Sequence, residues 1–175
     1  MTGIDRVEYA YLTRLLTEDT PLFGLVRSAA GWLLLDRAGC AGLAALVQGG
    51  VLPKPDLISR LMHRTNPTRA RAETAARRLA IARALRPGLA RLLRRLPEGA
   101  SYLNVGHANL TDRGLGTISR AGLQVTVLIH DTIPLDHPEF ARPDTVEPFR
   151  AKLAAVSAHA AQVIHITKDA QARTN

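Results

Sequence analysis

The strongest signal in the hydrophobic pattern is an almost unbroken β-branched and aliphatic run over residues 125–129. His130 and Asp131 end this run abruptly, and a proline-containing loop follows. A short apolar run between turn signals predicts a strand buried on both faces, as in parallel sheets. Because open α/β sheets bind ligands at the carboxyl ends of their strands, the polar pair marks a place to look for function.

The C-terminal half alternates between strand-like runs and helical periodicity. Strands are predicted over 101–105, 123–129 and 162–166, with helices over 110–120 and 149–161. Strand, helix, strand, helix, strand with short connections is typical of βαβ units. We therefore predict an α/β fold, namely a Rossmann-like three-layer domain with a mostly parallel sheet.

The N-terminal half has a less regular pattern. Helices are predicted over 3–18, 37–48 and 57–63, the last capped by Asp56, and short strands over 21–26 and 32–35. The longest helical stretch is expected from Asn66 to about Arg95, kinked or split at Pro87-Gly88. Residues 1–175 are expected to form a single domain that is incomplete at both ends, because no strand precedes the first helix and only the start of a helix follows the last strand.

The composition is that of a globular protein, with 46% hydrophobic and 22% charged residues among 175. No apolar run approaches the roughly 20 residues that span a bilayer, and the first residues do not have the order of a signal peptide. Cys40 is the only cysteine, so a disulfide framework is excluded. We expect a cytoplasmic protein.

The net charge of +8 comes almost entirely from arginine and raises nucleic acid or an anionic membrane as a partner. An aromatic content of 4% and the lack of a recognised motif argue against nucleic acid. Within the stretch after Thr68, the arginines predict a solvated helix face or, alternatively, a patch that meets acidic lipid headgroups; they are Arg77, Arg78, Arg83, Arg91, Arg94 and Arg95.

Three polar groups follow predicted strands, and a parallel sheet would bring them to one edge. They are residues 104–109, with Gly106, His107 and Asn109; residues 130–132, with His130 and Asp131; and residues 167–169, with Thr167. His130 could clamp sugar hydroxyls or act as a base, and Gly106 would let the backbone approach a ligand. For each histidine, a loop side chain bonded to backbone is the alternative.

The remaining candidates carry weaker signals. Gly3 opens a helix, where free N–H groups can bind a phosphate, although a simple helix cap is the alternative. His137 is expected to belong to a turn, while His63, His159 and His165 lack polar company in the sequence. No histidine pair has the spacing of a helical zinc site and the carboxylates are not clustered, so no metal is expected.

Four segments resemble the N-terminal, acceptor-side half of group 1 glycosyltransferases of the GT-B fold. They are T-G-I-D-R-V-E at 2–8, Y-L-N-V-G-H-A-N-L at 102–110, I-H-D-T-I-P-L-D-H-P-E-F at 129–140 and A-Q-V-I-H-I-T at 161–167. The third segment is the specific one, and the order along the chain also agrees. The resemblance is weakest between Gly39 and Pro97.

The resemblance implies one half of a GT-B enzyme that moves a sugar from a nucleotide-sugar donor to a saccharide or glycolipid acceptor, with retention and without a bound metal. It implies that His130 lies beside the transferred sugar, that Gly3 lies near the donor phosphates, and that His107 and Asn109 lie on the acceptor side. The C-terminal nucleotide-sugar domain of the family is absent, so this fragment alone is expected to be inactive. An acceptor on an anionic membrane would bring the protein to the inner face of that membrane.

Two other functions fit the same residues. The first is a non-catalytic α/β module that binds a phosphorylated or sugar ligand at the strand ends. The second is a basic nucleic-acid adaptor, which has little beyond the charge in its favour.

Overall fold

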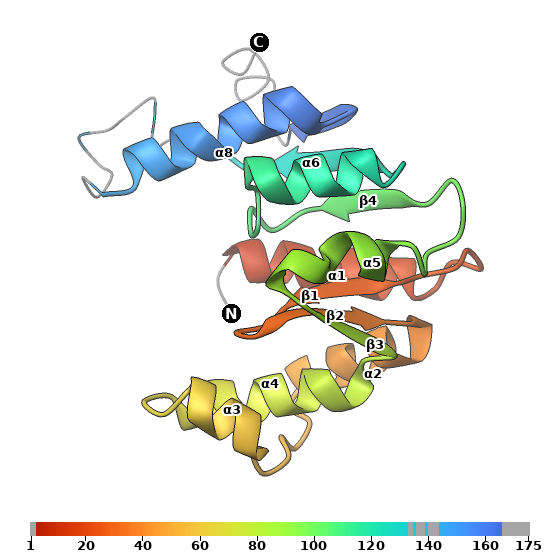
Figure 1. Cartoon of the computed structure of the whole chain (residues 1–175), viewed down its shortest axis with the longest axis vertical. Coiled ribbons are helices and arrows are strands. Elements are labelled where there is room, and N and C mark those ends of the chain that lie inside the picture. Colours follow the sequence, from red (N-terminus) through yellow and green to blue (C-terminus); the bar gives the residue numbers. More distant parts are fainter. Residues whose placement is uncertain (1–2, 133–134, 136–138, 140–143, 166–175) are drawn as a thin grey trace. The chain divides into compact units, whose positions relative to one another are not determined.

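The computed structural model describes residues 3–132, 135, 139 and 144–165 (Figure 1). The chain forms two compact units. The parallel-sheet unit comprises Met1–Glu8 and Pro97–Asn175, and the antiparallel-sheet unit comprises Tyr9–Leu96. Helix α1, Gly3–Leu15, begins in the first unit and ends in the second.

The parallel-sheet unit contains the strand order β4-β5-β6, with both pairs parallel. Its strands are β4 (Ser101–Asn104), β5 (Gln124–Ile129) and β6 (Gln162–His165), and its helices are α6 (Asp112–Arg120) and α8 (Val146–His159). Helix α6 packs on β5, and α8 packs on α6. The central strand β5 is buried on both faces, since Val125, Val127 and Leu128 are all buried. The strand expected from the hydrophobic run is thus confirmed.

The antiparallel-sheet unit has the order β1-β2-β3, with every pair antiparallel. Its strands are β1 (Gly24–Arg27), β2 (Gly31–Leu35) and β3 (Ala82–Leu85), and its helices are the C-terminal part of α1, α2 (Arg37–Val47), α3 (Leu57–Met62), α4 (Pro67–Leu79) and α5 (Leu89–Leu93). All five residues of β2 are buried. Only three residues join β1 to β2, and so short a connection permits only antiparallel pairing.

The α/β class is therefore confirmed, and the expected parallel pairing holds in the C-terminal half. In the N-terminal half the strands pair antiparallel.

The prediction of a long helix from Asn66 to Arg95 is wrong for the middle of that stretch. Helix α4 ends at Leu79, and Ala82–Leu85 instead pairs with β2, followed by the 3-10 turn Arg86–Gly88. The pairing starts with the Ile81 N–H, which donates to the Leu34 carbonyl at 2.9 Å. Alanine, arginine and leucine favour a helix, but the open edge of β2 offers a ladder of backbone partners that outweighs this weak preference.

The solvated helix face expected for the arginines is also partly wrong. Arg78, Arg83, Arg91, Arg94 and Arg95 are exposed, whereas only 5% of Arg77 is exposed. Arg77 contacts both Asp56 and Glu73, at 3.1 and 3.4 Å. Glu73 lies one turn before Arg77 on α4, whereas Asp56 is 21 residues away, so the burial of this arginine depends in part on a contact that the local pattern does not reveal.

Candidate functional site

The carboxyl ends of β4 and β5 meet at one edge of the parallel sheet, because Asn104 is paired in register with Val127. The loop over 104–109 and the residues 130–132 therefore lie together, as expected from the sequence. Thr167, the candidate after β6, lies outside the described residues. We call the first two groups, together with Glu8, the strand-end site.

The ring of His130 is fixed by the loop that follows β4. Its Nε2 lies 2.6 Å from the carbonyl oxygen of Val105. A carbonyl can only accept, so Nε2 must carry a proton. In the neutral ring this leaves Nδ1 as a lone pair that can accept a proton or a hydrogen bond from a ligand hydroxyl.

His107 bonds to the backbone of β5. Its Nε2 accepts a hydrogen bond from the His130 N–H at 3.0 Å, and the two rings meet edge to face with centroids 4.9 Å apart. Burial lowers the pKa of His107, and His130 and Lys152 act in the same direction, while Asp131 and a backbone hydrogen bond at Leu128 oppose them. His107 is therefore favoured as the neutral ring, and it holds the loop after β4 to the tip of β5.

The loop that carries His107 has an uncommon backbone. His107 and Asn109 have φ angles of 56° and 60°, and they are the only non-glycine residues with positive φ among those that the structure describes. Such a conformation costs on the order of 1 kcal/mol or more for a histidine. The Asn104 side chain stabilises the loop, since its amide donates to the Ala108 carbonyl at 2.8 Å and its oxygen accepts from the Gly106 N–H at 3.3 Å.

Helix α1 brings a carboxylate to the site. A Cβ atom on Gly106 would collide with the Glu8 carboxylate, so the loop and the helix approach this closely only because residue 106 is a glycine. Burial raises the pKa of Glu8, Asp5 raises it further, and His130 lowers it. The charges of Glu8 and His130 therefore interact across the site.

Gly3, the expected phosphate-binding residue, is the first residue of α1 and precedes Glu8 by five positions. A helix rises about 1.5 Å per residue, so Gly3 lies one and a half turns before Glu8 on the same helix. No described atom lies within 4 Å of a Cβ built on Gly3. Packing within the described residues thus does not require a glycine here.

The sequence interpretation did not assign a role to three residues of this site, Glu8, Tyr102 and Asn104. Tyr102 Oη accepts a hydrogen bond from the Asn104 amide at 2.9 Å. Burial raises the pKa of Tyr102, and the nearby Glu8 carboxylate adds to this shift. The signal available in the sequence was the spacing of Tyr102 and Asn104, because alternate residues of a strand share a face.

Two histidines that lack polar neighbours in the sequence have them in the fold. His63 Nε2 lies 2.8 Å from Glu73 Oε2, and His159 Nε2 lies 2.7 Å from Asp112 Oδ1. Each carboxylate lies on another helix, so these polar contacts could not be seen in the local sequence. His165 also has an interaction partner, and His137 lies outside the described residues.

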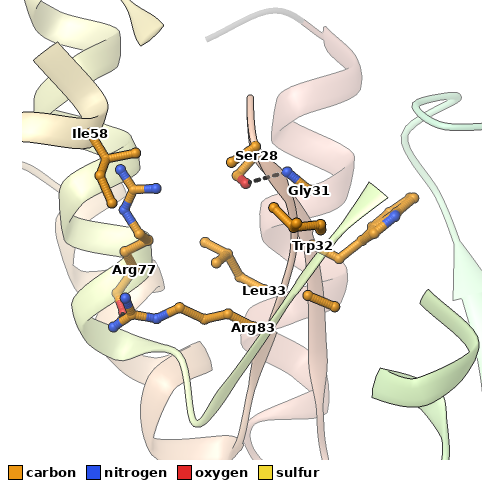
Figure 2. A pocket seen from close by; sticks show the side chains of 10 residues that line it. Ser28, Gly31, Trp32, Leu33, Ile58, Arg77 and Arg83 are labelled. Atoms are coloured by element: carbon orange, nitrogen blue, oxygen red, sulfur yellow. Dashed lines mark hydrogen bonds between the residues drawn. The ribbon is translucent and has the colours of Figure 1, made fainter. Parts of the chain in front are cut away.

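A cavity of about 240 Å³ lies in the antiparallel-sheet unit. Figure 2 shows Ile58 and Arg77 on one side of it and Leu33 and Ser28 on the other. Arg83 also lines the cavity and donates from Nη2 to the Arg77 carbonyl at 3.1 Å. The Glu73 carboxylate nearby accepts from the Ala29 N–H and from His63, so this unit has a polar network of its own.

Among the described residues, no group of three or more His, Cys, Asp or Glu side chains could hold a metal ion. The described helices likewise include none that is long and apolar enough to cross a membrane. Comparisons with protein-family models, with curated proteins and with solved structures give no match.

Proposed function

We propose that this chain is the acceptor-side part of a GT-B glycosyltransferase, with the parallel-sheet unit as its Rossmann-like core. The observation that carries the proposal is the His130 ring at the carboxyl edge of the sheet, with Nε2 bonded to Val105 and Nδ1 available as an acceptor. The H-D-T-I-P-L-x-x-P-E-F run that follows β5 supports the same reaction class. The donor would be a nucleotide sugar and the acceptor a saccharide or glycolipid.

In this proposal His130 positions the reacting sugar rather than supplying a strong base. Nδ1 accepts a hydrogen bond from a sugar hydroxyl, and the Val105 carbonyl fixes the ring in the tautomer that this bond requires. Glu8 adds negative charge near the ring, which favours any positive charge that develops on the imidazole or on the sugar. The second domain of the family would supply the grip on the nucleotide.

The test uses the complete product of the gene and the release of nucleotide from UDP-glucose, GDP-mannose and related donors. The variant is His130→Ala, and the matched control is His159→Ala, which removes a histidine bonded to Asp112. Loss of a positioning contact predicts a transfer rate lower by about 100-fold for His130→Ala and little changed for the control. Both variants are first shown to be folded by near-UV circular dichroism.

Equal transfer rates for the two variants would remove His130 from the mechanism. A complete protein that binds saccharides but transfers none of the sugars would instead support the non-catalytic binding module.

A further inference from the structure

The excess positive charge of the chain is confined to one unit. The antiparallel-sheet unit contains fifteen Lys and Arg residues against five Asp and Glu, a net charge of +10, whereas the parallel-sheet unit contains eight against ten, a net charge of −2. A basic composition spread over the whole chain would not divide in this way. The division indicates a partner for the antiparallel-sheet unit with negative charge.

The same unit exposes an unusual apolar face on helix α3. Leu57, Ile58, Leu61 and Met62 are 80%, 51%, 60% and 50% exposed. At about 100° per residue, these four side chains cover about 140° of the helix circumference. Single exposed leucines are ordinary on protein surfaces, but a cluster on one helical face marks an interaction surface.

The orientation of α3 is fixed by polar contacts on its opposite side. Ser59 is fully buried, and its hydroxyl accepts hydrogen bonds from Arg77 Nη2 at 2.6 Å and from Thr74 Oγ1 at 2.9 Å. Asp56 caps the helix and also pairs with Arg77 at 3.1 Å. These contacts hold the Ser59 side of α3 on α4, whereas the four apolar side chains lie elsewhere on the helix circumference and are exposed.

The exposed charges around this face are mostly positive. From Val51 to Leu96 the only acidic residues are Asp56 and Glu73, and both pair with the buried Arg77. The exposed basic residues that flank α3 are Lys54, Arg60, Arg64, Arg69 and Arg71. The exposed basic residues on and beside α3 thus outnumber the one carboxylate there, Asp56, whose side chain is 38% exposed and is paired with Arg77.

The apolar surface continues beyond the helix. Ile58 lies on α3 and also lines the cavity of the antiparallel-sheet unit (Figure 2). Leu85, which is 69% exposed, lines the same cavity. Apolar area is therefore presented by both the helix and the mouth of the cavity.

We propose that α3 and its basic flanks form a docking surface for an anionic lipid bilayer, with Leu57, Ile58, Leu61 and Met62 inserted at the level of the headgroups. Apolar side chains on one face and cations beside them are the requirements for interfacial binding, in which a helix buries its apolar face by about 5–10 Å. This proposal is independent of sugar transfer.

Two other occupants fit the surface less well. The exposed apolar side chains of α3 are aliphatic or a thioether, and they cannot stack on bases as the aromatic residues of nucleic-acid sites do. A second copy of the chain would bring two units of net charge +10 together, and their repulsion opposes such a dimer.

The first test is co-sedimentation of the 175-residue chain with vesicles of phosphatidylglycerol and phosphatidylcholine, and with vesicles of phosphatidylcholine alone. We expect binding to the anionic vesicles that weakens with salt, and a partition coefficient lower by at least about tenfold for Leu57→Ser/Leu61→Ser. The matched control, Val47→Ser/Val163→Ser, also removes two exposed apolar side chains and should bind as the unaltered chain does. Lys54→Gln/Arg64→Gln should reduce binding to the anionic vesicles and weaken its salt dependence.

The second test reports insertion directly. A Leu61→Cys variant is labelled with an environment-sensitive fluorophore. Cys40 does not compete for the label, because it is buried and burial raises the pKa of its thiol to about 11. We expect a blue-shifted emission on anionic vesicles at position 61 and none for the same label on Val47→Cys. Equal binding of Leu57→Ser/Leu61→Ser and the unaltered chain would overturn the proposal, as would equal binding to both kinds of vesicle or an unshifted label at position 61.

Discussion

Nε2 of His107 accepts a hydrogen bond from the backbone N–H of His130 at 3.0 Å. This bond joins the loop after β4 to the tip of β5, the two segments that form the strand-end site. The ring of His130 forms a second bond between the same two segments, because its Nε2 donates to the carbonyl of Val105. The two histidines therefore differ in role, since His107 Nε2 accepts from a backbone N–H and His130 Nε2 donates to a backbone carbonyl.

The stability of the fold should fall as the pH is lowered through the range in which His107 would gain a proton. Burial lowers the pKa of His107 in the folded chain, so below a pH of about 6.5 the unfolded chain binds more protons than the folded one. The free energy of unfolding therefore decreases with falling pH until the pH reaches the lowered pKa, and becomes independent of this group below it. Urea unfolding between pH 8 and 5 measures the effect.

The matched variant for that experiment is His107→Gln, which cannot titrate. Its stability should be lower by about 1 kcal/mol at pH 8, because the bond to the His130 N–H is lost or weakened. The difference from the unaltered chain should shrink toward pH 5. Identical pH profiles for the two proteins would show that His107 does not contribute.

Arg77→Met should be strongly destabilising. Arg77 is buried between Asp56 and Glu73, and its removal leaves the buried Glu73 carboxylate with less compensation. Removing one partner of a buried ion pair costs about 3–5 kcal/mol. The control is Arg78→Met, one residue along α4 and exposed, which should change the free energy of unfolding by less than about 0.5 kcal/mol. Similar losses for both variants in urea unfolding would contradict the structure.

Gly106→Ala should be destabilising through one contact. The added methyl group would displace the Glu8 carboxylate, whereas the backbone of Gly106 lacks the positive φ that would strain an alanine. The cost should therefore largely disappear in a Glu8→Ala background. Urea unfolding of the four proteins of this cycle should give a coupling energy of about 1 kcal/mol. A coupling near zero would mean that loop and helix do not meet at this point.

The Gly3→Ala variant distinguishes two roles for Gly3, a simple helix start and a phosphate-binding site. No described atom opposes the methyl group, and alanine favours a helix over glycine, so the fold should be unchanged or more stable by up to about 1 kcal/mol. If Gly3 admits a donor phosphate, the complete protein should nevertheless bind its nucleotide-sugar donor more weakly. Donor affinity that is unaffected, measured by calorimetry, would leave Gly3 as the start of a helix only.

The sequence was informative wherever a local pattern sufficed. Burial of β5 followed from the apolar run alone, and the side-chain cap of α3 by Asp56 followed from one polar residue before an apolar segment. The parallel order of β4, β5 and β6 followed from the alternation of strands with helices. These features depend on periodicity and short connections, which can be seen in the order of the residues.

Other features depend on partners that are distant in the sequence. Ala82–Leu85 became a strand because β2 offered it an open edge, and the burial of Arg77 depends on Asp56, which lies 21 residues away. The left-handed residue His107 likewise has a distant partner, since its ring accepts from the N–H of His130, which lies 23 residues away. The sequence by itself thus determined which residues form the central parallel strand and that His130 stands at its end. Only the tertiary structure decided which ring nitrogen of His130 carries the proton that is donated to the backbone, because that depends on a carbonyl 25 residues away.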